Sequence, residues 1–299
     1  MNDEKGVITV KFQEKNVGDF YNRWSSELMK RWKAMEETSA LHYGFHTLKT
    51  KSMKQSFLNM NDYVAKLLNI NEVKNQQILD AGCGIGGTSI YFSKMYPNLA
   101  FTGITISSHQ ISMAQELSKK MNISNARFEF YNYLNTGFSD NQFDKIFALE
   151  SFSYCTNYKK FIDEMYRILK PGGTLAVVDA FRTPRKIGNM MKKTYNCFST
   201  AYGNAVLTRI DEYKKYLNEK GFENILVENI TWNVAPSVFL WSFPAISNYV
   251  SKKIKVNKSS ENSKNNDKNQ YDKYGNLFAF IVGACGIIKY YGTSAIKKK

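Results

Sequence analysis

The chain has 299 residues, of which 43% are hydrophobic and 22% charged, and it carries a formal net charge of +15 at pH 7. This composition excludes an intrinsically disordered chain and allows one or two folded domains. The sequence has no run of about 18 apolar residues that could span a membrane, no apolar signal-peptide region, and no metal-ligand or disulfide spacing among its four cysteines. We therefore expect a cytoplasmic protein without a metal site.

The positive charge has more than one interpretation. Much of it comes from lysines interspersed with Asn, Ser and Tyr, which a bias in composition alone can produce. It can also attract the chain to an anionic membrane surface, an anionic substrate or a nucleic acid. The sequence leaves these alternatives open.

The N-terminal part is predicted to be largely helical. After a polar start with a short β-like stretch at residues 7–12, apolar residues recur with helical spacing from Asn16 to about Ile70. Between the helical segments lies Leu41-His-Tyr-Gly-Phe-His46, which is unusually aromatic for a loop. On its residues alone, this segment is a helix-to-helix connection packed by aromatic side chains.

Residues 78–88 read as a short apolar strand that runs into a glycine turn and then a helix. Because glycine lets the backbone fold sharply and lets a ligand approach it, Gly82, Gly84 and Gly86 indicate a cofactor seat. Asp80 stands two residues before the first glycine, where a carboxylate would repel a pyrophosphate but attract an ammonium or sulfonium group. The alternative is a tight turn that binds nothing.

This stretch resembles the first motif of class I S-adenosylmethionine-dependent methyltransferases. The resemblance implies an α/β fold with a Rossmann-like seven-stranded sheet, the last strand antiparallel, flanked by helices, with an N-terminal helical cap and acceptor-side insertions. It also implies S-adenosylmethionine as the cofactor. The predicted boundaries are a cap at 1–72, a cofactor-binding core at 73–181, and the last two strands at 182–299 with insertions at 182–206 and 232–286.

The aromatic segment 41–46 gains a second interpretation from this family. It resembles the His-His-Gly-Phe/Tyr segment of tocopherol, sterol and related small-molecule methyltransferases, with Tyr43 where the second His often stands. By the resemblance, Tyr21 and this segment close over the cofactor and the acceptor.

The second predicted strand, residues 100–106, leads into a polar run. Residues 103–110 resemble the Gly-Ile-Thr/Ser-Leu/Ile-Ser-x-x-Gln run of the tocopherol, sterol and sugar O-methyltransferase group, with Thr105 where many relatives have an acid. The resemblance assigns cofactor contacts to Ser107 and Gln110. As sequence alone, the run is only the N-cap of a helix.

A third strand at residues 126–131 is followed by Asn132 and Tyr133, at the place where the family surrounds the adenine. An Asn side chain can accept a hydrogen bond from an exocyclic amine, and Tyr133 can stack on the ring or simply pack. Taken together, the resemblance implies twelve cofactor contacts: Tyr21, Asp80, Gly82, Cys83, Gly84, Gly86, Thr105, Ser107, Gln110, Asn132, Tyr133 and Leu149.

The buried strand that begins at Phe143 ends in polar residues. Ligands of open parallel sheets bind beyond the carboxyl ends of the strands, where Glu150, Ser153 and Tyr154 are expected. Ser153 and Tyr154 replace a His pair of the relatives, and the Glu-Ser-x-x-Tyr form resembles terpenoid C-methyltransferases, where the Glu is implicated in proton removal. After a helix at 158–169 and a Pro-Gly-Gly turn, the fifth strand ends at Asp179, which either serves the acceptor or caps the next segment.

The C-terminal third completes the predicted sheet. Residues 232–236 resemble a stretch that follows the sixth strand of tocopherol methyltransferases, and the apolar residues after them indicate an acceptor wall or an interfacial patch. The remaining predictions are a basic, then helical insertion at 182–206, a helix from Ile210 to Gly221, a strand at 225–231, a Lys/Asn/Ser-rich loop at 251–275, a helix-compatible segment at 276–286 and a strand at 287–296.

The function implied is methylation of a small, largely apolar acceptor, such as an isoprenoid, a polycyclic compound or another specialised metabolite. C-, N- and O-methylation stay open. Glu150 is the first candidate for proton transfer, followed by His42, Asp179 and Tyr154. Aromatic faces stabilise positive charge, and the candidates for such a wall are Tyr43, Phe45, Phe152, Tyr154 and Trp241.

Two other functions are compatible with parts of the sequence. The basic charge suggests an RNA methyltransferase, but residues 149–154 lack the Asn/Asp-Pro-Pro-aromatic tetrad of amino-methylating nucleic-acid enzymes, so we expect no specific nucleic-acid partner. A non-catalytic partner protein could keep the same fold. The expected ligand is a small-molecule acceptor, with contact to an anionic membrane surface and oligomerisation left open.

Overall fold

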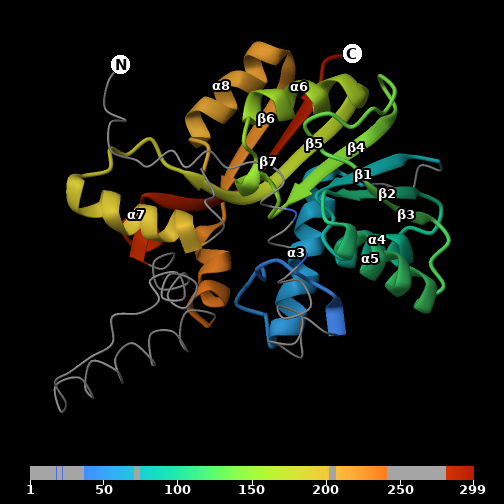
Figure 1. The fold of residues 1–299 in the computed structure, drawn as a ribbon, viewed down its shortest axis with the longest axis horizontal. Helices are drawn as coiled ribbons and strands as arrows, with labels where there is room; N and C mark the ends of the chain where they lie inside the picture. Colours follow the sequence, from blue (N-terminus) through green and yellow to red (C-terminus); the bar gives the residue numbers. More distant parts are fainter. Residues whose placement is uncertain (1–17, 19–21, 23–36, 71–74, 202–206, 241–280) are drawn as a thin grey trace.

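The fold is built on one central sheet with helices on both of its faces, as Figure 1 shows. This computed structural model describes residues 18, 22, 37–70, 75–201, 207–240 and 281–299. The predicted contact Tyr21, the predicted wall residue Trp241 and the predicted loop at 251–275 lie outside the described residues.

The sheet has seven strands in the order β3-β2-β1-β4-β5-β7-β6. The strands β1 to β5 pair in parallel, whereas β7 pairs antiparallel with β5 on one side and β6 on the other. This order and the antiparallel β7 confirm the fold predicted from the sequence. The strands are β1 Gln77–Ala81, β2 Ala100–Thr105, β3 Ala126–Phe130, β4 Phe143–Leu149, β5 Leu169–Arg182, β6 Phe222–Asn229 and β7 Ile288–Lys297.

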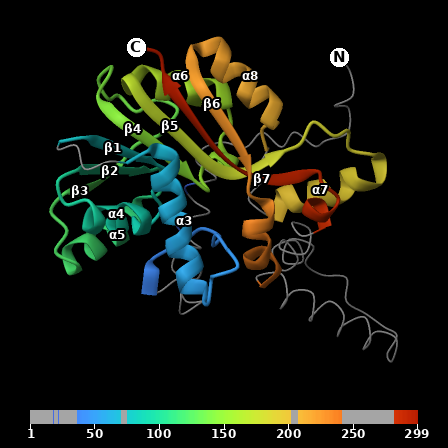
Figure 2. The ribbon, with the colours of Figure 1, turned by 180° about the vertical axis from the view of Figure 1, so that it is seen from behind.

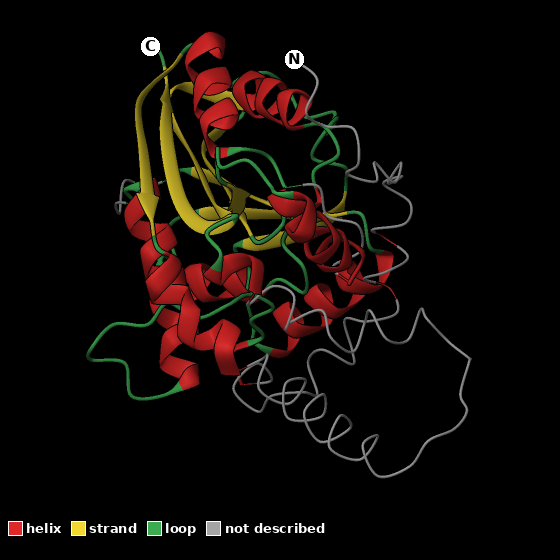
Figure 3. Cartoon of the chain, turned by 90° about the vertical axis from the view of Figure 1, so that its left-hand side faces the viewer, coloured by secondary structure: helices red, strands yellow, loops and turns green. Residues whose placement is uncertain are grey.

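The helices form two layers, and Figure 3 shows the strands between them. Alternate residues of the central strands face opposite layers because side chains of a strand point alternately up and down. In β4, for example, Ile146 packs with the layer of α6 and α8, and Phe147 packs with the layer of α3 and α4. The helices are α3 Met53–Leu68, α4 Gly87–Met95, α5 Ser108–Lys120, η1 Phe152–Tyr154, α6 Tyr158–Ile168, α7 Asn189–Ala201 and α8 Ile210–Lys220.

Helix α3 comes from the predicted N-terminal cap but packs on the sheet itself. Its buried residues Met60, Val64 and Leu68 lie in one cluster with Phe147 of β4 and Tyr290 of β7. Seen from behind, α3 crosses the middle of the molecule (Figure 2). The segment just before it lies beyond the carboxyl end of β4, where the N–H of Tyr43 donates to Glu150.

Strand β5 differs from the prediction at its start. The Pro-Gly-Gly sequence was expected to form a turn before the strand, but β5 already begins at Leu169. Its pairing with β4 jumps from Leu169–Phe143 to Thr174–Lys145, so the extra residues bulge out of the ladder. Gly172 has a φ of +77°, which explains why the bulge carries a glycine.

No described helix combines the length and the apolar composition that crossing a bilayer requires.

Candidate functional site

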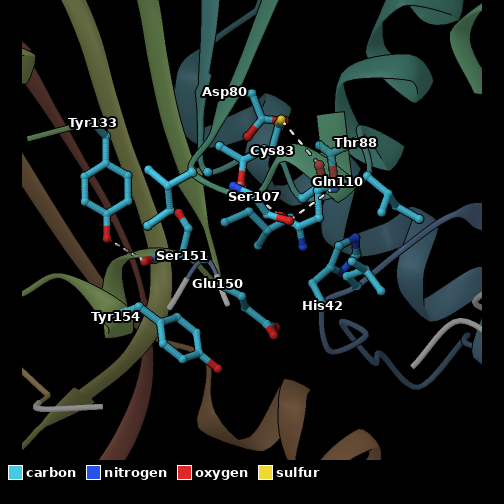
Figure 4. Close-up of a pocket in the computed structure, with 18 of the residues that line it drawn as sticks. His42, Asp80, Cys83, Thr88, Ser107, Gln110, Tyr133, Glu150, Ser151 and Tyr154 are labelled. Atoms are coloured by element: carbon cyan, nitrogen blue, oxygen red, sulfur yellow. Dashed lines mark hydrogen bonds between the residues drawn. The ribbon is translucent and has the colours of Figure 1, made fainter. Parts of the chain in front are cut away.

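A cavity of about 970 Å³, counted out to its open mouth, lies beyond the carboxyl ends of β1, β2 and β4. Figure 4 shows side chains from several segments converging on it. The predicted residues that line the cavity are Asp80, Gly82, Cys83, Gly84, Thr105, Ser107, Gln110, Asn132, Tyr133 and Leu149 on the cofactor side, and His42, Glu150 and Tyr154 among the catalytic candidates.

The three glycines of the turn all have a positive φ, but they serve different purposes. A Cβ on Gly84 would lie 3.4 Å from Cδ1 of Leu41, with the cavity open around it. A Cβ on Gly86 would lie only 2.7 Å from the ring of Phe128. Gly86 therefore allows β3 to pack against α4, and this predicted cofactor contact does not line the cavity.

Asp80 is placed at the end of β1, directly before the glycine turn. Its side chain is buried, and Oδ2 accepts a hydrogen bond of 2.7 Å from the hydroxyl of Ser89 on α4. Burial raises the pKa of Asp80 to about 7, and the bond from Ser89 opposes this rise only partly. No salt bridge to Asp80 occurs within the described residues. A cation bound nearby would stabilise the ionised carboxylate.

The polar run after β2 forms the N-terminus of α5 and faces the cavity. Ser107 is the N-cap, because its Oγ accepts from the backbone N–H of Gln110 at 3.2 Å, and it also donates to Asn22 at 2.6 Å. Thr105 donates to Oε1 of Gln110 at 2.8 Å. The capping interpretation is confirmed, and the segment also carries three polar side chains into the cavity wall. Contact of Ser107 and Gln110 with a cofactor stays a prediction.

Asn132 and Tyr133 line the cavity after β3, and each also has a local structural contact. Oδ1 of Asn132 accepts from the N–H of Leu134 at 2.9 Å, which closes a turn. The ring of Tyr133 packs edge-on against Phe161, and its hydroxyl donates to the carbonyl of Ser151 at 3.2 Å. A role of these residues beside an adenine stays a prediction.

Glu150 follows β4 with a φ of +51°, an uncommon conformation for a residue other than glycine. Its backbone N–H donates to the carbonyl of Val178 at 2.9 Å, and its Oε1 accepts from the N–H of Tyr43 at 2.6 Å. Burial raises the pKa of Glu150 to about 8; the nearby charge of Asp179 adds to the rise, and the Tyr290 hydroxyl offsets part of it. A buried carboxyl held in this way is suited to exchange a proton near neutral pH.

His42 lies on the same side of the cavity, and Figure 4 shows Glu150 between it and Tyr154. Its Nδ1 donates to the carbonyl of Tyr43 at 2.9 Å, because a carbonyl can only accept. Burial lowers the pKa of His42 to about 4, so the imidazole is neutral at pH 7. Its buried Nε2 makes no hydrogen bond of acceptable geometry, although the Asn61 side chain lies next to it.

Asp179, the remaining catalytic candidate, does not line the cavity. It is buried within β5, which continues to Arg182 and does not end at Asp179 as predicted. Asp179 accepts from the N–H of Ser153 at 2.8 Å and from that of Ala180 at 2.7 Å. Burial raises its pKa to about 6. Asp179 therefore fixes the short helix η1, and through it the position of Tyr154, instead of reaching the cavity itself.

Most of the predicted aromatic wall is used for packing. Phe152 is 2% exposed and packs in the core, while Tyr43 lies edge-on to Tyr290 and Phe45 stacks on Tyr63 at 4.8 Å. None of these three lines the cavity; of the described candidates, Tyr154 does. The prediction failed for Phe152 because a short apolar run does not reveal whether a ring after the strand points into the core or into the cavity.

Sequence reasoning missed several lining residues, above all Ser39, Thr88 and Ser151. Ser151 donates to the carbonyl of Ala81 at 2.6 Å and so joins the ends of β4 and β1. Its place directly after Glu150 was the available signal. Ser39 had none, because small residues in a loop carry no specific pattern.

The aromatic segment 41–46 is tied to a helix at residues 231–240. His46 donates its N–H to the carbonyl of Asn233 at 2.8 Å, and the Asn233 side chain donates back to the carbonyl of His46 at 2.9 Å. The buried hydroxyl of Ser237 accepts from the N–H of Gly44 at 3.0 Å and lies 2.9 Å from Nε2 of His46. These bonds fix the segment that carries His42 and Tyr43 above the strand ends.

Comparison with known proteins agrees with this geometry. The family model described as "Methyltransferase domain" matches residues 72–221. The chain is 25% identical over 222 residues to the 27-O-demethylrifamycin SV methyltransferase of Amycolatopsis mediterranei, covering 74% of this chain and 78% of that protein. It is 26% identical over 198 residues to the sterol 24-C-methyltransferase of Saccharomyces cerevisiae, covering 65% of this chain but only 51% of that protein.

The fold is also found among solved structures. Geranyl diphosphate C-methyltransferase from Streptomyces coelicolor, crystallised with Mg2+, geranyl diphosphate and S-adenosyl-L-homocysteine, superposes with a TM-score of 0.70 at 15% identity. The match covers 95% of this chain and 97% of that one. At this identity the match shows a shared fold.

Proposed function

Because this chain belongs to the methyltransferase domain family, we propose that it transfers the methyl group of S-adenosylmethionine to a small, largely apolar acceptor. The observation that carries the proposal is one cavity that joins the glycine turn and Asp80 to a buried proton acceptor, Glu150. The names of the relatives support the acceptor class, since they specify a rifamycin and a sterol.

The residues at the glycine turn fit such a donor. Gly84 presents backbone to the cavity with room where a Cβ would stand, and Asp80 is a buried carboxylate without a cationic partner among the described residues. When bound, S-adenosylmethionine supplies an electrophilic methyl group on a sulfonium. Asp80 would hold its positive end, and Ser107 and Gln110 would bind its polar groups.

The acceptor side needs a group that takes up a proton. Methylation of a hydroxyl or of a primary or secondary amine releases a proton, and methylation of an alkene gives a carbocation that then loses one. A positioned carboxylate can accept the proton in each case. Glu150 lines the cavity, and the N–H of Tyr43 holds its carboxylate at 2.6 Å. We assign Glu150 as the base and Tyr154 as an aromatic and hydroxyl contact of the acceptor. His42, neutral at pH 7, contributes a hydrogen-bond acceptor without a charge.

The test combines binding with product detection. Purified protein is titrated with S-adenosylhomocysteine in a calorimeter, then supplied with labelled S-adenosylmethionine and extracts of its source, and the labelled product is identified by mass. Glu150→Gln should bind S-adenosylhomocysteine but lose product formation, whereas Glu223→Gln, an exposed change on β6, should behave like the unchanged protein. Absence of saturable binding by the unchanged protein would defeat the proposal.

A further inference from the structure

The two most exposed large apolar side chains of the described part lie on adjoining segments. Leu48 shows 108% of its reference exposure and Trp232 shows 87%. Single exposed apolar residues are ordinary, but clustered ones mark interaction sites. The position of these two side chains relative to each other therefore decides whether they form a surface.

Hydrogen bonds place Leu48 and Trp232 in the same region. Trp232 directly precedes Asn233, which exchanges two hydrogen bonds with the backbone of His46, and Leu48 follows His46 by two residues. Leu48 stands in a tight turn, because the N–H of Thr50 donates to the carbonyl of Thr47 at 3.0 Å. The turn thus projects Leu48 and its neighbour Lys49 into solvent beside the start of the helix at 231–240.

Positive charge predominates on the segment that carries Leu48, although Glu228 bonds the hydroxyl of Tyr63, whose ring stacks on Phe45. The sequence has no Asp or Glu between residues 38 and 61, while Lys49, Lys51 and Lys54 are all exposed there. Lys54 pairs with Glu37 at 3.1 Å, and within the described part of the chain no ion pair involves Lys49 or Lys51. The helix at 231–240 contains no charged residue.

We propose that Leu48, Lys49, Lys51 and Trp232 form a docking surface for an anionic lipid bilayer. Trp favours the boundary between headgroups and acyl chains, a Leu at a turn tip can enter the acyl region, and each Lys close to the surface attracts anionic lipids. A second copy of the chain fits this surface less well, since lysine is depleted from protein interfaces.

In the sequence, the docking surface directly follows residues that line the cavity or hold its wall. The segment that ends in the Leu48 turn carries His42, which lines the cavity, and Tyr43, whose N–H holds Glu150. The inference deepens the proposed function, because an apolar acceptor dissolved in a bilayer would enter from the side on which the protein docks. Docking itself requires no methyl donor, so it is measured separately.

The test is sedimentation of the full chain with vesicles in the absence of any methyl donor. Vesicles of phosphatidylcholine alone are compared with vesicles containing about 30% phosphatidylglycerol. We expect binding to the anionic vesicles to be at least about tenfold tighter and to weaken at high salt. The double variants Leu48→Ser/Trp232→Ser and Lys49→Glu/Lys51→Glu should each lose about tenfold or more of this binding.

The control is Leu226→Ser, which changes an exposed apolar residue on β6 (48% exposed) and should leave vesicle binding unchanged. Circular dichroism verifies that each variant is folded without relying on any ligand. Equal binding to neutral and anionic vesicles, or unchanged binding by both double variants, would overturn the proposal. So would concentration-dependent self-association that the Leu48→Ser/Trp232→Ser variant abolishes. A failure of methyl transfer alone would affect the proposed function and not this surface.

Discussion

Replacing Gly84 and Gly86 by alanine, one at a time, should separate ligand access from packing. Both residues have a positive φ, +54° and +82°, so alanine at either position costs about 1–2 kcal/mol of strain. At position 84 the new methyl group makes only an ordinary contact, 3.4 Å from Leu41. At position 86 it would lie 2.7 Å from Phe128 and 3.1 Å from Ala114, and such overpacking costs about 1–3 kcal/mol more.

The two variants should therefore show opposite profiles. Gly84→Ala should lose about 1–2 kcal/mol of unfolding free energy but bind S-adenosylhomocysteine at least about tenfold more weakly, because its methyl group enters the cavity. Gly86→Ala should lose about 2–5 kcal/mol of unfolding free energy while its folded fraction binds with nearly unchanged affinity.

Urea denaturation followed by circular dichroism measures the first quantity, and calorimetry at a temperature where both variants are folded measures the second. The reasoning would be refuted if Gly84→Ala bound the ligand as tightly as the unchanged protein. It would also be refuted if Gly86→Ala were no less stable than Gly84→Ala.

Three further changes test other parts of the site. In the unchanged protein kcat/KM should rise with pH and level off above about 8, because only ionised Glu150 accepts a proton. Glu150→Gln should lower the rate about 10²–10⁴-fold. A flat pH profile of the unchanged protein would contradict this role of Glu150. Affinity for the donor, measured by calorimetry, should fall as pH drops below about 7 because protonation neutralises Asp80, and Asp80→Asn should remove the dependence. Ser237→Ala should lose about 1–3 kcal/mol of unfolding free energy, because it leaves the buried N–H of Gly44 without its partner. Urea denaturation measures this loss, and unchanged stability would show that the bond is dispensable.

The sheet and the glycine turn could be predicted because their signals are local. Buried parallel strands such as β1 and β4 read as short apolar runs, and the glycines that follow β1 mark a turn within the same stretch of sequence. Local reading, aided by the family resemblance, also placed Glu150 and Ser107 just after strand ends, and both line the cavity. The antiparallel β7 came from the resemblance alone.

What could not be predicted depends on contacts between distant parts of the chain. Gly86 and Gly84 look equivalent in the sequence, and Phe128 of β3, far along the chain, gives them different roles. Phe152 turns into the core because Asp179 of another strand fixes the turn around it. The bond between His46 and Ser237 joins residues 191 positions apart, which no periodicity reveals.

The position of β7 also bears on how the protein is made. This strand is synthesised after β6 and the long stretch at 230–287, yet it inserts between β5 and β6, which leave the ribosome earlier. Until β7 emerges, the open edge of β5 is exposed to chaperones and to other nascent chains, and Tyr290 is missing from its place beside Glu150. Every described residue that lines the cavity lies before residue 157, so the nascent chain carries the whole cavity wall before the strand that places Tyr290 beside Glu150 exists.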